Sequence, residues 1–209
     1  APCTAISDKL RKKMGEAALK ADKAAHYVNA GTIEFLLEKN EQFYFMEMNT
    51  RIQVEHPVTE WVTGLDLIKE QIRIASGGAL SVSQKDIRIS GHAIECRINA
   101  ENPDKNFRPS PGRIESLYLP GGCGVRMDTA VYSGYTIPPY YDSMIAKLIV
   151  HGKDRREAIA KMISALGEVI VEGIDTKVDN HYPILNEPDY QPGRTDIEYL
   201  NPHHILKRE

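Results

Sequence analysis

The stretch FYFMEMNTRIQVEHP, residues 43–57, places a polar side chain at every second position after an aromatic, strand-like start. Its polar residues are Glu47, Asn49, Arg51, Gln53 and Glu55. Because successive side chains of an extended backbone point to opposite faces, these five can line one surface. Two carboxylates, two amides and a guanidinium are the groups that hold a metal ion and a small anion together. The stretch therefore predicts a polar site on one face of a strand, with the methionines and aliphatic residues between them free to enter a core.

A second strand with its own carboxylate lies just upstream. Residues 31–38 read GTIEFLLE, and a short polar loop separates them from the aromatic start, which is a hairpin signal. If the turn centres between Asn40 and Glu41, Glu34 lies directly opposite Glu47. A slip of one residue would instead place the two carboxylates on opposite faces.

The opposed carboxylates predict a cation site. Like charges at about 5 Å repel by roughly 3 kcal/mol at an effective dielectric near 20. A divalent cation between Glu34 and Glu47 reverses the sign of this interaction, and oxygen ligands suit magnesium or manganese. The alternative from spacing alone is an exposed hairpin whose glutamates are solvated.

Several segments carry a resemblance to one family. Glu34 and residues 47–60, EMNTRIQVEHPVTE, resemble the catalytic strand and loop of biotin carboxylases, which are the ATP-grasp enzymes of biotin-dependent carboxylases. The resemblance continues in GLDLI (64–68), GHAIECRINAE (91–101), PSPG (109–112) and PYYDSM (139–144). It spans nearly the whole chain. A carbamoyl-phosphate synthetase is the alternative among ATP-grasp ligases, but it would not explain the segments around Arg97 and at 139–144.

The resemblance implies an α+β fold in two parts. Residues 1–80 correspond to the C-terminal part of an ATP-grasp domain, an antiparallel sheet with helices. Residues 81–209 correspond to a biotin carboxylase C-terminal domain of mixed strands and helices. Complete members carry an N-terminal domain and a lid with a glycine-rich phosphate loop, and no GxxxxGK[ST] sequence occurs here. We therefore interpret the chain as the C-terminal half of a larger enzyme and expect it to be inactive alone.

The implied reaction is the carboxylation of carrier-bound biotin with ATP and bicarbonate, through carboxyphosphate. The resemblance suggests the biotin carboxylase subunit of acetyl-CoA carboxylase, which serves fatty acid synthesis. The alternatives are the corresponding part of a pyruvate or other acyl-CoA carboxylase, or a module for dimerisation or carrier docking without activity of its own. The implied partners are a biotin carboxyl carrier protein, carboxyltransferase subunits and a second copy of the chain.

The residue roles implied by the resemblance begin with the cation and the nucleotide. Glu34, Glu47 and Asn49 resemble the ligands of the magnesium (or manganese) ion that bridges the terminal phosphates of ATP. Glu34 and Glu47 thereby also count as ATP-binding residues. Leu36, on the same face as Glu34, resembles the apolar residue that packs against adenine; most such leucines are core residues.

The remaining roles concern bicarbonate and biotin. Arg51 resembles the arginine that holds bicarbonate, with Gln53 and the backbone of Val54 as further contacts. Glu55 resembles the general base that deprotonates bicarbonate. Arg97 resembles the arginine that stabilises the biotin enolate, although a surface ion pair with its neighbour two positions earlier is the simpler alternative.

Composition excludes other classes. The 209 residues carry a formal net charge of −3, which gives no basic footprint for nucleic acid. No apolar stretch approaches the roughly 20 residues of a membrane span, so no membrane partner is expected. The three cysteines form neither a zinc spacing nor a disulfide framework, which favours a reducing cytoplasm. Cys123 stands where many relatives have an aromatic residue, in a segment that resembles part of the family's homodimer contact.

Local signals place the elements around these motifs. We expect helices from Ser7 to about Tyr27, from Pro57 to Gly64, from Asp66 to Gly77, after Asp154, and from Thr176 towards Leu185, with strands at 93–99, 114–119, 125–127 and 143–150. A domain boundary is expected near Leu80. Tyr140 and Tyr141 are expected to pack beside the site, and His203 and His204 to be solvated.

Overall fold

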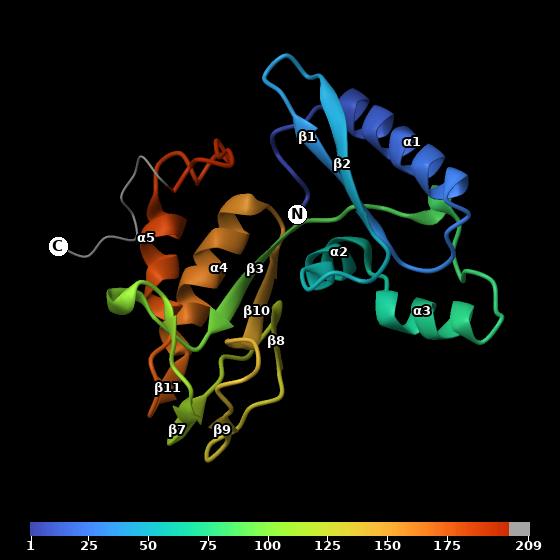
Figure 1. Cartoon of the computed structure of the whole chain (residues 1–209). Helices are drawn as coiled ribbons and strands as arrows, with labels where there is room; N and C mark the ends of the chain where they lie inside the picture. The colour runs from blue at the N-terminus through green and yellow to red at the C-terminus, as the bar shows by residue number, and fades with distance from the viewer. Residues whose placement is uncertain (201–209) are drawn as a thin grey trace. The chain divides into compact units, whose positions relative to one another are not determined.

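A computed structural model describes residues 1–200 of the chain (Figure 1). Its contacts divide the chain into two compact units, one formed by Pro2–Ile89 and the other by Ala1 together with the residues from Ser90 onward. The division lies nine residues beyond Leu80, where the sequence suggests a boundary, and a boundary at Leu80 remains a proposal. His203 and His204 lie outside the described residues.

The first unit consists of helices around one hairpin. Its elements are α1 (Asp8–Ala24), β1 (Thr32–Leu37), β2 (Phe43–Asn49), α2 (His56–Thr63), α3 (Leu67–Ala75) and the 3-10 turn η1 (Gln84–Asp86). The helix starts predicted at Ser7 and Asp66 are confirmed by their caps, because the side chain of Ser7 accepts from the amide of Leu10 and that of Asp66 from the amide of Lys69. Gly64 ends α2 with φ of 73°, in the left-handed region that favours glycine.

The hairpin of β1 and β2 has the predicted register at its polar end. Glu34 pairs with Glu47, and Thr32 pairs with Asn49. The register shifts by one residue between Glu34 and Phe35, so that Phe35 pairs with Phe45. The bulge re-aligns the strands towards the loop while Glu34 and Glu47 stay opposed. The prediction that the two carboxylates share a face is therefore confirmed.

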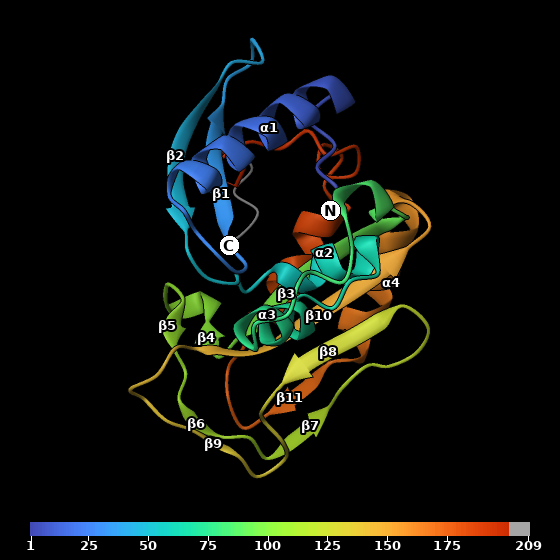
Figure 2. The same ribbon diagram turned by 90° about the vertical axis from the view of Figure 1, so that its right-hand side faces the viewer.

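The second unit is built on a three-stranded antiparallel sheet in the order β3-β10-β8, with β3 at His92–Asn99, β10 at Met144–Gly152 and β8 at Val125–Thr129. Helix α4 (Arg155–Glu168) begins at Asp154, whose side chain accepts from the amide of Glu157, as the sequence predicts. Figure 2 shows these strands side by side, with α4 next to them.

The hydrophobic core of the described residues lies in this second unit, between the sheet and α4. Its fully buried side chains include Ile98, Leu148, Ile159, Met162 and Leu166. Every second residue of β3 enters this core, since Ile94, Cys96 and Ile98 are buried. The intervening residues, Glu95, Arg97 and Asn99, therefore face the opposite side of the sheet.

Short elements complete the second unit. Three two-stranded ladders pair β4 (Glu101–Asn102) with β5 (Arg108–Pro109), β6 (Gly112–Arg113) with β9 (Thr136–Ile137), and β7 (Ser116–Tyr118) with β11 (Ile170–Glu172). The turns η2 (Pro103–Lys105) and η3 (Val178–Asn180) and the helix α5 (His181–Asn186) account for the rest. Tyr140 and Tyr141 are 79% and 77% exposed, so the expectation that they pack is wrong: each ring meets chiefly the other, with centroids 5.3 Å apart.

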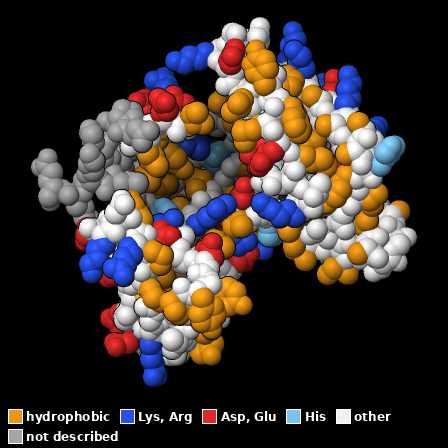
Figure 3. Space-filling model, in the orientation of Figure 1, with side chains coloured by type: hydrophobic (Ala, Val, Ile, Leu, Met, Phe, Trp, Pro, Cys, Tyr) orange, Lys and Arg blue, Asp and Glu red, His pale blue; other side chains and the backbone are white. Residues whose placement is uncertain are grey.

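The architecture confirms the predicted α+β class, with small antiparallel sheets and helices. None of the helices among residues 1–200 combines the length and the apolar character needed to cross a membrane. Exposed hydrophobic side chains are visible over the first unit (Figure 3). The exposed hydrophobic side chains of the hairpin are Leu36, Leu37, Tyr44, Phe45 and Met46.

Candidate functional site

The candidate site begins on the face of the hairpin that carries Glu34 and Glu47. Asn49 joins the two carboxylates, because its Nδ2 donates to Glu34 Oε1 at 3.0 Å and to Glu47 Oε1 at 2.8 Å. Both oxygens therefore lie within hydrogen-bond reach of one nitrogen. Antiparallel pairing produces this arrangement, since Glu34 and Glu47 are ladder partners and Asn49 follows Glu47 on the same face.

The loop after β2 brings two more predicted residues to the same cluster. Gln53 Nε2 donates to Glu34 Oε1 at 2.8 Å, so this oxygen accepts from two amides. Arg51 donates through Nη2 to Asn49 Oδ1 at 3.3 Å and through Nη1 to the carbonyl of Ile52 at 3.2 Å. The predicted cation ligands and the predicted anion ligands thus form one hydrogen-bonded chain.

A pocket of about 250 Å³ adjoins this cluster, within the first unit. Arg51, Gln53 and Glu55 line it, together with Ala30, Gly31, Thr32, Ile52, His56, Val58, Thr59 and Leu67. A pocket with a guanidinium, an amide and a carboxylate at its wall can hold a small planar anion beside a base. Val54 is half-buried between two of these residues in sequence.

Glu55 stands at the N-terminus of α2 and is exposed. It is the N-cap residue, and its side chain makes no capping hydrogen bond to the helix. His56 supports this turn, because its Nδ1 lies 2.7 Å from the carbonyl oxygen of Gln53. This contact ties the start of α2 to the backbone of Gln53, on either side of Glu55 in sequence.

Leu36 lies on the same face of β1 as Glu34, two residues further along. It pairs with Tyr44 of β2, and the two side chains are 51% and 49% exposed. An exposed apolar pair beside the carboxylates can accept a flat aromatic ring. Tyr44 was not identified from the sequence, because its pairing with Leu36 depends on the bulge.

Arg97 belongs to the second unit, on the solvent side of β3. It pairs with Lys147 of β10, which in turn pairs with Asp128 of β8. Asp128 accepts two hydrogen bonds from Arg126, at 2.7 and 2.8 Å, and lies 3.5 Å from Lys147 Nζ. Burial opposes ionisation of Asp128, but the hydrogen bonds and charge of Arg126, with the charge of Lys147, outweigh burial and lower its pKa.

Two residues beside Arg97 were missed by sequence reasoning. Lys147 is its ladder partner, and His181 Nε2 lies 3.1 Å from the Arg97 carbonyl oxygen. Burial lowers the pKa of His181, which favours the neutral ring. A strand signal predicts Lys147 to lie in a sheet, but only the pairing of β10 with β3 identifies its neighbour.

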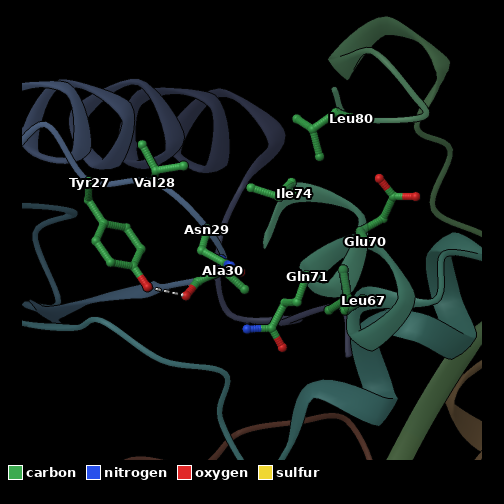
Figure 4. Close-up of a pocket in the computed structure, with 9 residues that line it drawn as sticks. All are labelled: Tyr27, Val28, Asn29, Ala30, Leu67, Glu70, Gln71, Ile74 and Leu80. Carbon is green, nitrogen blue, oxygen red and sulfur yellow. Dashed lines mark hydrogen bonds between the residues drawn. The ribbon is translucent and has the colours of Figure 1, made fainter. Parts of the chain in front are cut away.

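A larger pocket of about 420 Å³ lies between the α1–β1 loop and α3 (Figure 4). It shares Ala30 and Leu67 with the smaller pocket but contains none of the predicted site residues. Tyr27 donates its hydroxyl to the carbonyl of Ala30, and Glu70 accepts from the Ser81 hydroxyl and amide. The hydrogen bonds from Ser81 lower the pKa of Glu70. These polar groups are used within the protein, so the candidate site remains the smaller pocket and its cluster.

Comparison with protein families gives two matches. Residues 95–202 match the family described as the biotin carboxylase C-terminal domain. Residues 1–83 match the family described as the carbamoyl-phosphate synthase L chain, ATP binding domain.

Individual relatives agree with these matches. Biotin carboxylase 1 of Bacillus subtilis is 56% identical over 206 residues, which cover 98% of this chain and 46% of that protein. A pyruvate carboxylase subunit of Methanothermobacter thermautotrophicus is 54% identical over 201 residues, covering 96% of this chain and 41% of that protein. The chain therefore spans less than half the length of these curated relatives.

Solved structures show the same likeness. The biotin carboxylase domain dimer of Hydrogenobacter thermophilus 2-oxoglutarate carboxylase, in complex with MgADP, ADP and bicarbonate, matches with a TM-score of 0.95 at 46% identity; the match covers 100% of this chain and 46% of that one. The complete pyruvate carboxylase of Rhizobium etli matches with a TM-score of 0.95 at 35% identity, covering 100% of this chain and 21% of that one.

Proposed function

This chain belongs to the biotin carboxylase family, and from that premise we propose that the protein containing it carboxylates carrier-bound biotin with ATP and bicarbonate, through carboxyphosphate. The observation that carries the proposal is the cluster on the hairpin. Glu34 and Glu47 face each other around Asn49, and Arg51 and Gln53 connect them to the pocket that Glu55 lines.

Glu34, Glu47 and Asn49 offer oxygen atoms that fit a magnesium or manganese ion. The protein supplies two carboxylates and an amide here. Among residues 1–200, no group of three or more His, Cys, Asp or Glu side chains is placed to hold a metal ion. Magnesium is commonly held by one or two carboxylates together with the phosphates of a substrate. When bound, the ion would neutralise the charge that develops as the terminal phosphoryl group of ATP is transferred.

Arg51 and Gln53 provide the groups that hold bicarbonate, with the backbone of Val54. A guanidinium presents parallel N–H donors that match two oxygens of a planar anion, which a lysine does not. The pocket of about 250 Å³ has room for an anion of four heavy atoms.

Glu55 acts as the general base. Its carboxylate takes the proton of bicarbonate, and the oxygen so exposed forms a bond to the terminal phosphorus of ATP while the bond to ADP breaks. The products are carboxyphosphate and ADP. Glu55 lies at the N-terminus of α2 and lines the wall of the pocket that Arg51 and Gln53 also line, which supports this role.

Leu36 and Tyr44 form the apolar pair on which the adenine ring of ATP packs, beside the carboxylates of Glu34 and Glu47. This arrangement would place the base and the phosphates of one nucleotide along a single face of the hairpin.

Arg97 serves the second half of the reaction. Carboxyphosphate yields carbon dioxide and phosphate, and phosphate removes the proton from the ureido nitrogen of biotin. The guanidinium of Arg97 stabilises the oxyanion that develops on the ureido oxygen. It lies on the solvent side of β3, where Lys147 of β10 is its ladder partner.

We further propose that the parent complex is acetyl-CoA carboxylase in fatty acid synthesis, in the cytoplasm, with a biotin carboxyl carrier protein, carboxyltransferase subunits and a second copy of the chain as partners. Three unpaired cysteines suit a reducing compartment. Relatives include pyruvate and 2-oxoglutarate carboxylases, so the acyl acceptor requires its own test: acetyl-CoA against pyruvate, with carrier and transferase added.

The experiment that tests the proposed function uses the full-length protein that contains this chain. ADP release is measured against bicarbonate concentration, together with transfer of labelled bicarbonate to free biotin. Arg51→Ala should lower kcat/KM for bicarbonate by about 10–100-fold or more, because each charged hydrogen bond contributes roughly 1.5–3 kcal/mol. ATP binding should stay near the wild-type value.

The matched control is Arg73→Ala, which removes an arginine of α3 that pairs with Glu70 at 3.6 Å and does not line the site pocket. It should leave both rates unchanged. Wild-type ADP release that does not depend on bicarbonate, or an Arg51→Ala variant with normal kinetics, would refute the proposal.

A further inference from the structure

Asn49 occupies the position between two like charges. Its Nδ2 donates to one oxygen of Glu34 and one of Glu47, and these two residues are direct ladder partners. Opposed carboxylates destabilise a hairpin unless positive charge or hydrogen-bond donors compensate. The amide nitrogen of Asn49 therefore performs, in this structure, part of the task of a bridging cation.

The oxygen of the same Asn49 amide contacts Arg51. Asn49 Oδ1 accepts from Arg51 Nη2 at 3.3 Å. One side chain thus contacts both the carboxylates proposed to bind the cation and the guanidinium proposed to bind bicarbonate.

The oxygen of Glu34 at this cluster is fully used. A carboxylate oxygen has two lone pairs, and Glu34 Oε1 accepts from Asn49 at 3.0 Å and from Gln53 at 2.8 Å. A cation that coordinates this oxygen must displace at least one of the two amides. Asn49 is the one that also bridges to Glu47, so its nitrogen occupies the position of an ion shared by Glu34 Oε1 and Glu47 Oε1.

We propose that the Asn49 amide nitrogen occupies the place of the divalent cation, so that Asn49 is a placeholder for it. When the cation binds, the side-chain amide rotates so that its oxygen and nitrogen exchange positions. An amide binds a metal ion through its oxygen and never through its N–H₂ group. Rotation about the Cβ–Cγ bond presents Oδ1 to the cation and withdraws that oxygen from Arg51. The N–H₂ group that replaces it cannot accept a hydrogen bond, so the Nη2 donor of Arg51 is released to an anion, while Nη1 keeps its contact with the Ile52 carbonyl.

The consequence is a positive coupling between the two ligands of the site. Cation binding frees Arg51 for bicarbonate, and by linkage bicarbonate on Arg51 favours the cation by the same factor. This inference rests on the proposed function, because it takes the cation and anion sites from it. It adds a single side chain whose two orientations connect them.

The first test measures Mn²⁺ binding to the full-length protein, from the electron paramagnetic resonance signal of free Mn²⁺, with and without bicarbonate and without nucleotide. In the wild type, bicarbonate should tighten Mn²⁺ binding by about fivefold or more, the usual lower range of such couplings. In Asn49→Ala the Mn²⁺ affinities with and without bicarbonate should agree within about twofold, because the side chain that connects the carboxylates to Arg51 is absent.

The matched control is Asn40→Ala. Asn40 lies in the loop of the same hairpin and donates its Nδ2 to Glu38 Oε2 at 3.0 Å, a comparable amide-carboxylate bond away from the site. It should retain the wild-type coupling. Saturable Mn²⁺ binding with equal coupling in the wild type and Asn49→Ala overturns the placeholder alone. Absence of saturable Mn²⁺ binding in the wild type overturns the cation site of the proposed function as well.

A second measurement separates this role from simple support of the fold. Asn49→Asp keeps oxygen ligands but removes the N–H₂ group, leaving three carboxylates together. It should lower the melting temperature of the metal-free protein by about 2–8 °C. At saturating Mn²⁺ this deficit should disappear or reverse. An equal deficit with and without Mn²⁺ contradicts the proposal.

Discussion

Glu34 illustrates how a pair of like charges can be tolerated without an ion. The sequence predicts that Glu34 and Glu47 oppose each other and that a cation offsets their repulsion. The structure shows the opposition, and it shows that the N–H groups of Asn49 and Gln53 offset part of the cost. Both amides were selected from the sequence as site residues, but their contact with the carboxylates required the positions of the side chains.

His92 is a second residue whose environment was not foreseen. It begins β3 and is 5% exposed, and its Nε2 lies 3.2 Å from Arg155 Nη1. Burial lowers the pKa of His92 to about 4, and the positive charge of Arg155 acts in the same direction. Arg155 also donates to the carbonyls of Tyr190 and Gln191, so the His92 ring and these two residues contact the same guanidinium.

This environment predicts a pH dependence of stability. The folded pKa of about 4 lies below the ordinary value of 6.5, so between these values the unfolded chain binds a proton that the folded chain does not. The free energy of unfolding should therefore fall as the pH decreases from 6.5 to 4, by about 3 kcal/mol at most from this group. Urea unfolding at several pH values, with His92→Gln for comparison, measures it. Identical pH profiles for both proteins would count against this role.

At the scale of elements, the hairpin shows both the strength and the limit of sequence reasoning. Alternation of polar and apolar residues predicted the face of β2, and a symmetric turn predicted that Glu34 meets Glu47. The bulge after Glu34 was not predicted, because nothing in the sequence marks which residue stays unpaired. The hairpin loop closes at Glu41, which has a φ of 63° and whose amide donates to the carbonyl oxygen of Glu38 at 3.0 Å.

The positive φ of Glu41 predicts how substitutions in this loop change the free energy of unfolding. The left-handed region costs a residue with a Cβ roughly 1–2 kcal/mol, and glycine avoids this cost. Glycine loses more backbone entropy on folding, which offsets part of the benefit. Glu41→Gly should therefore raise the free energy of unfolding by about 0.5–1 kcal/mol. Lys39→Gly, at a neighbouring position without a positive φ, should lower it. Thermal unfolding of the two variants checks the prediction, and a destabilised Glu41→Gly would contradict it.

Across the described residues, elements with a local sequence signal were predictable, and the two-residue ladders were not. Ser7, Asp66 and Asp154 marked the starts of α1, α3 and α4 because capping is a local interaction between a side chain and the next turn. The two-residue ladders of the second unit depend on partners far apart in the sequence, such as Gly112 with Ile137. The exposure of Tyr140 and Tyr141 likewise depends on tertiary surroundings.

The residues proposed for the two steps of the reaction belong to different units. Arg51 and Glu55, proposed for the activation of bicarbonate, belong to the unit of Pro2–Ile89. Arg97, proposed for the transfer to biotin, belongs to the other unit. Motif resemblance supplied all three residues, while the structure supplied their local partners. The division leads to separate effects of mutation on the two steps.

The ratio of carboxybiotin formed to ADP released by the full-length protein tests this account most directly. Glu55→Gln removes the base, so both rates should fall together by roughly 10²–10⁴-fold, with the ratio unchanged. Arg97→Ala should leave bicarbonate-dependent ADP release near the wild-type rate and reduce the ratio towards zero. Arg156→Ala, an exposed arginine of α4, serves as the control and should change neither. Equal loss of both products in Arg97→Ala would contradict the proposed division of labour.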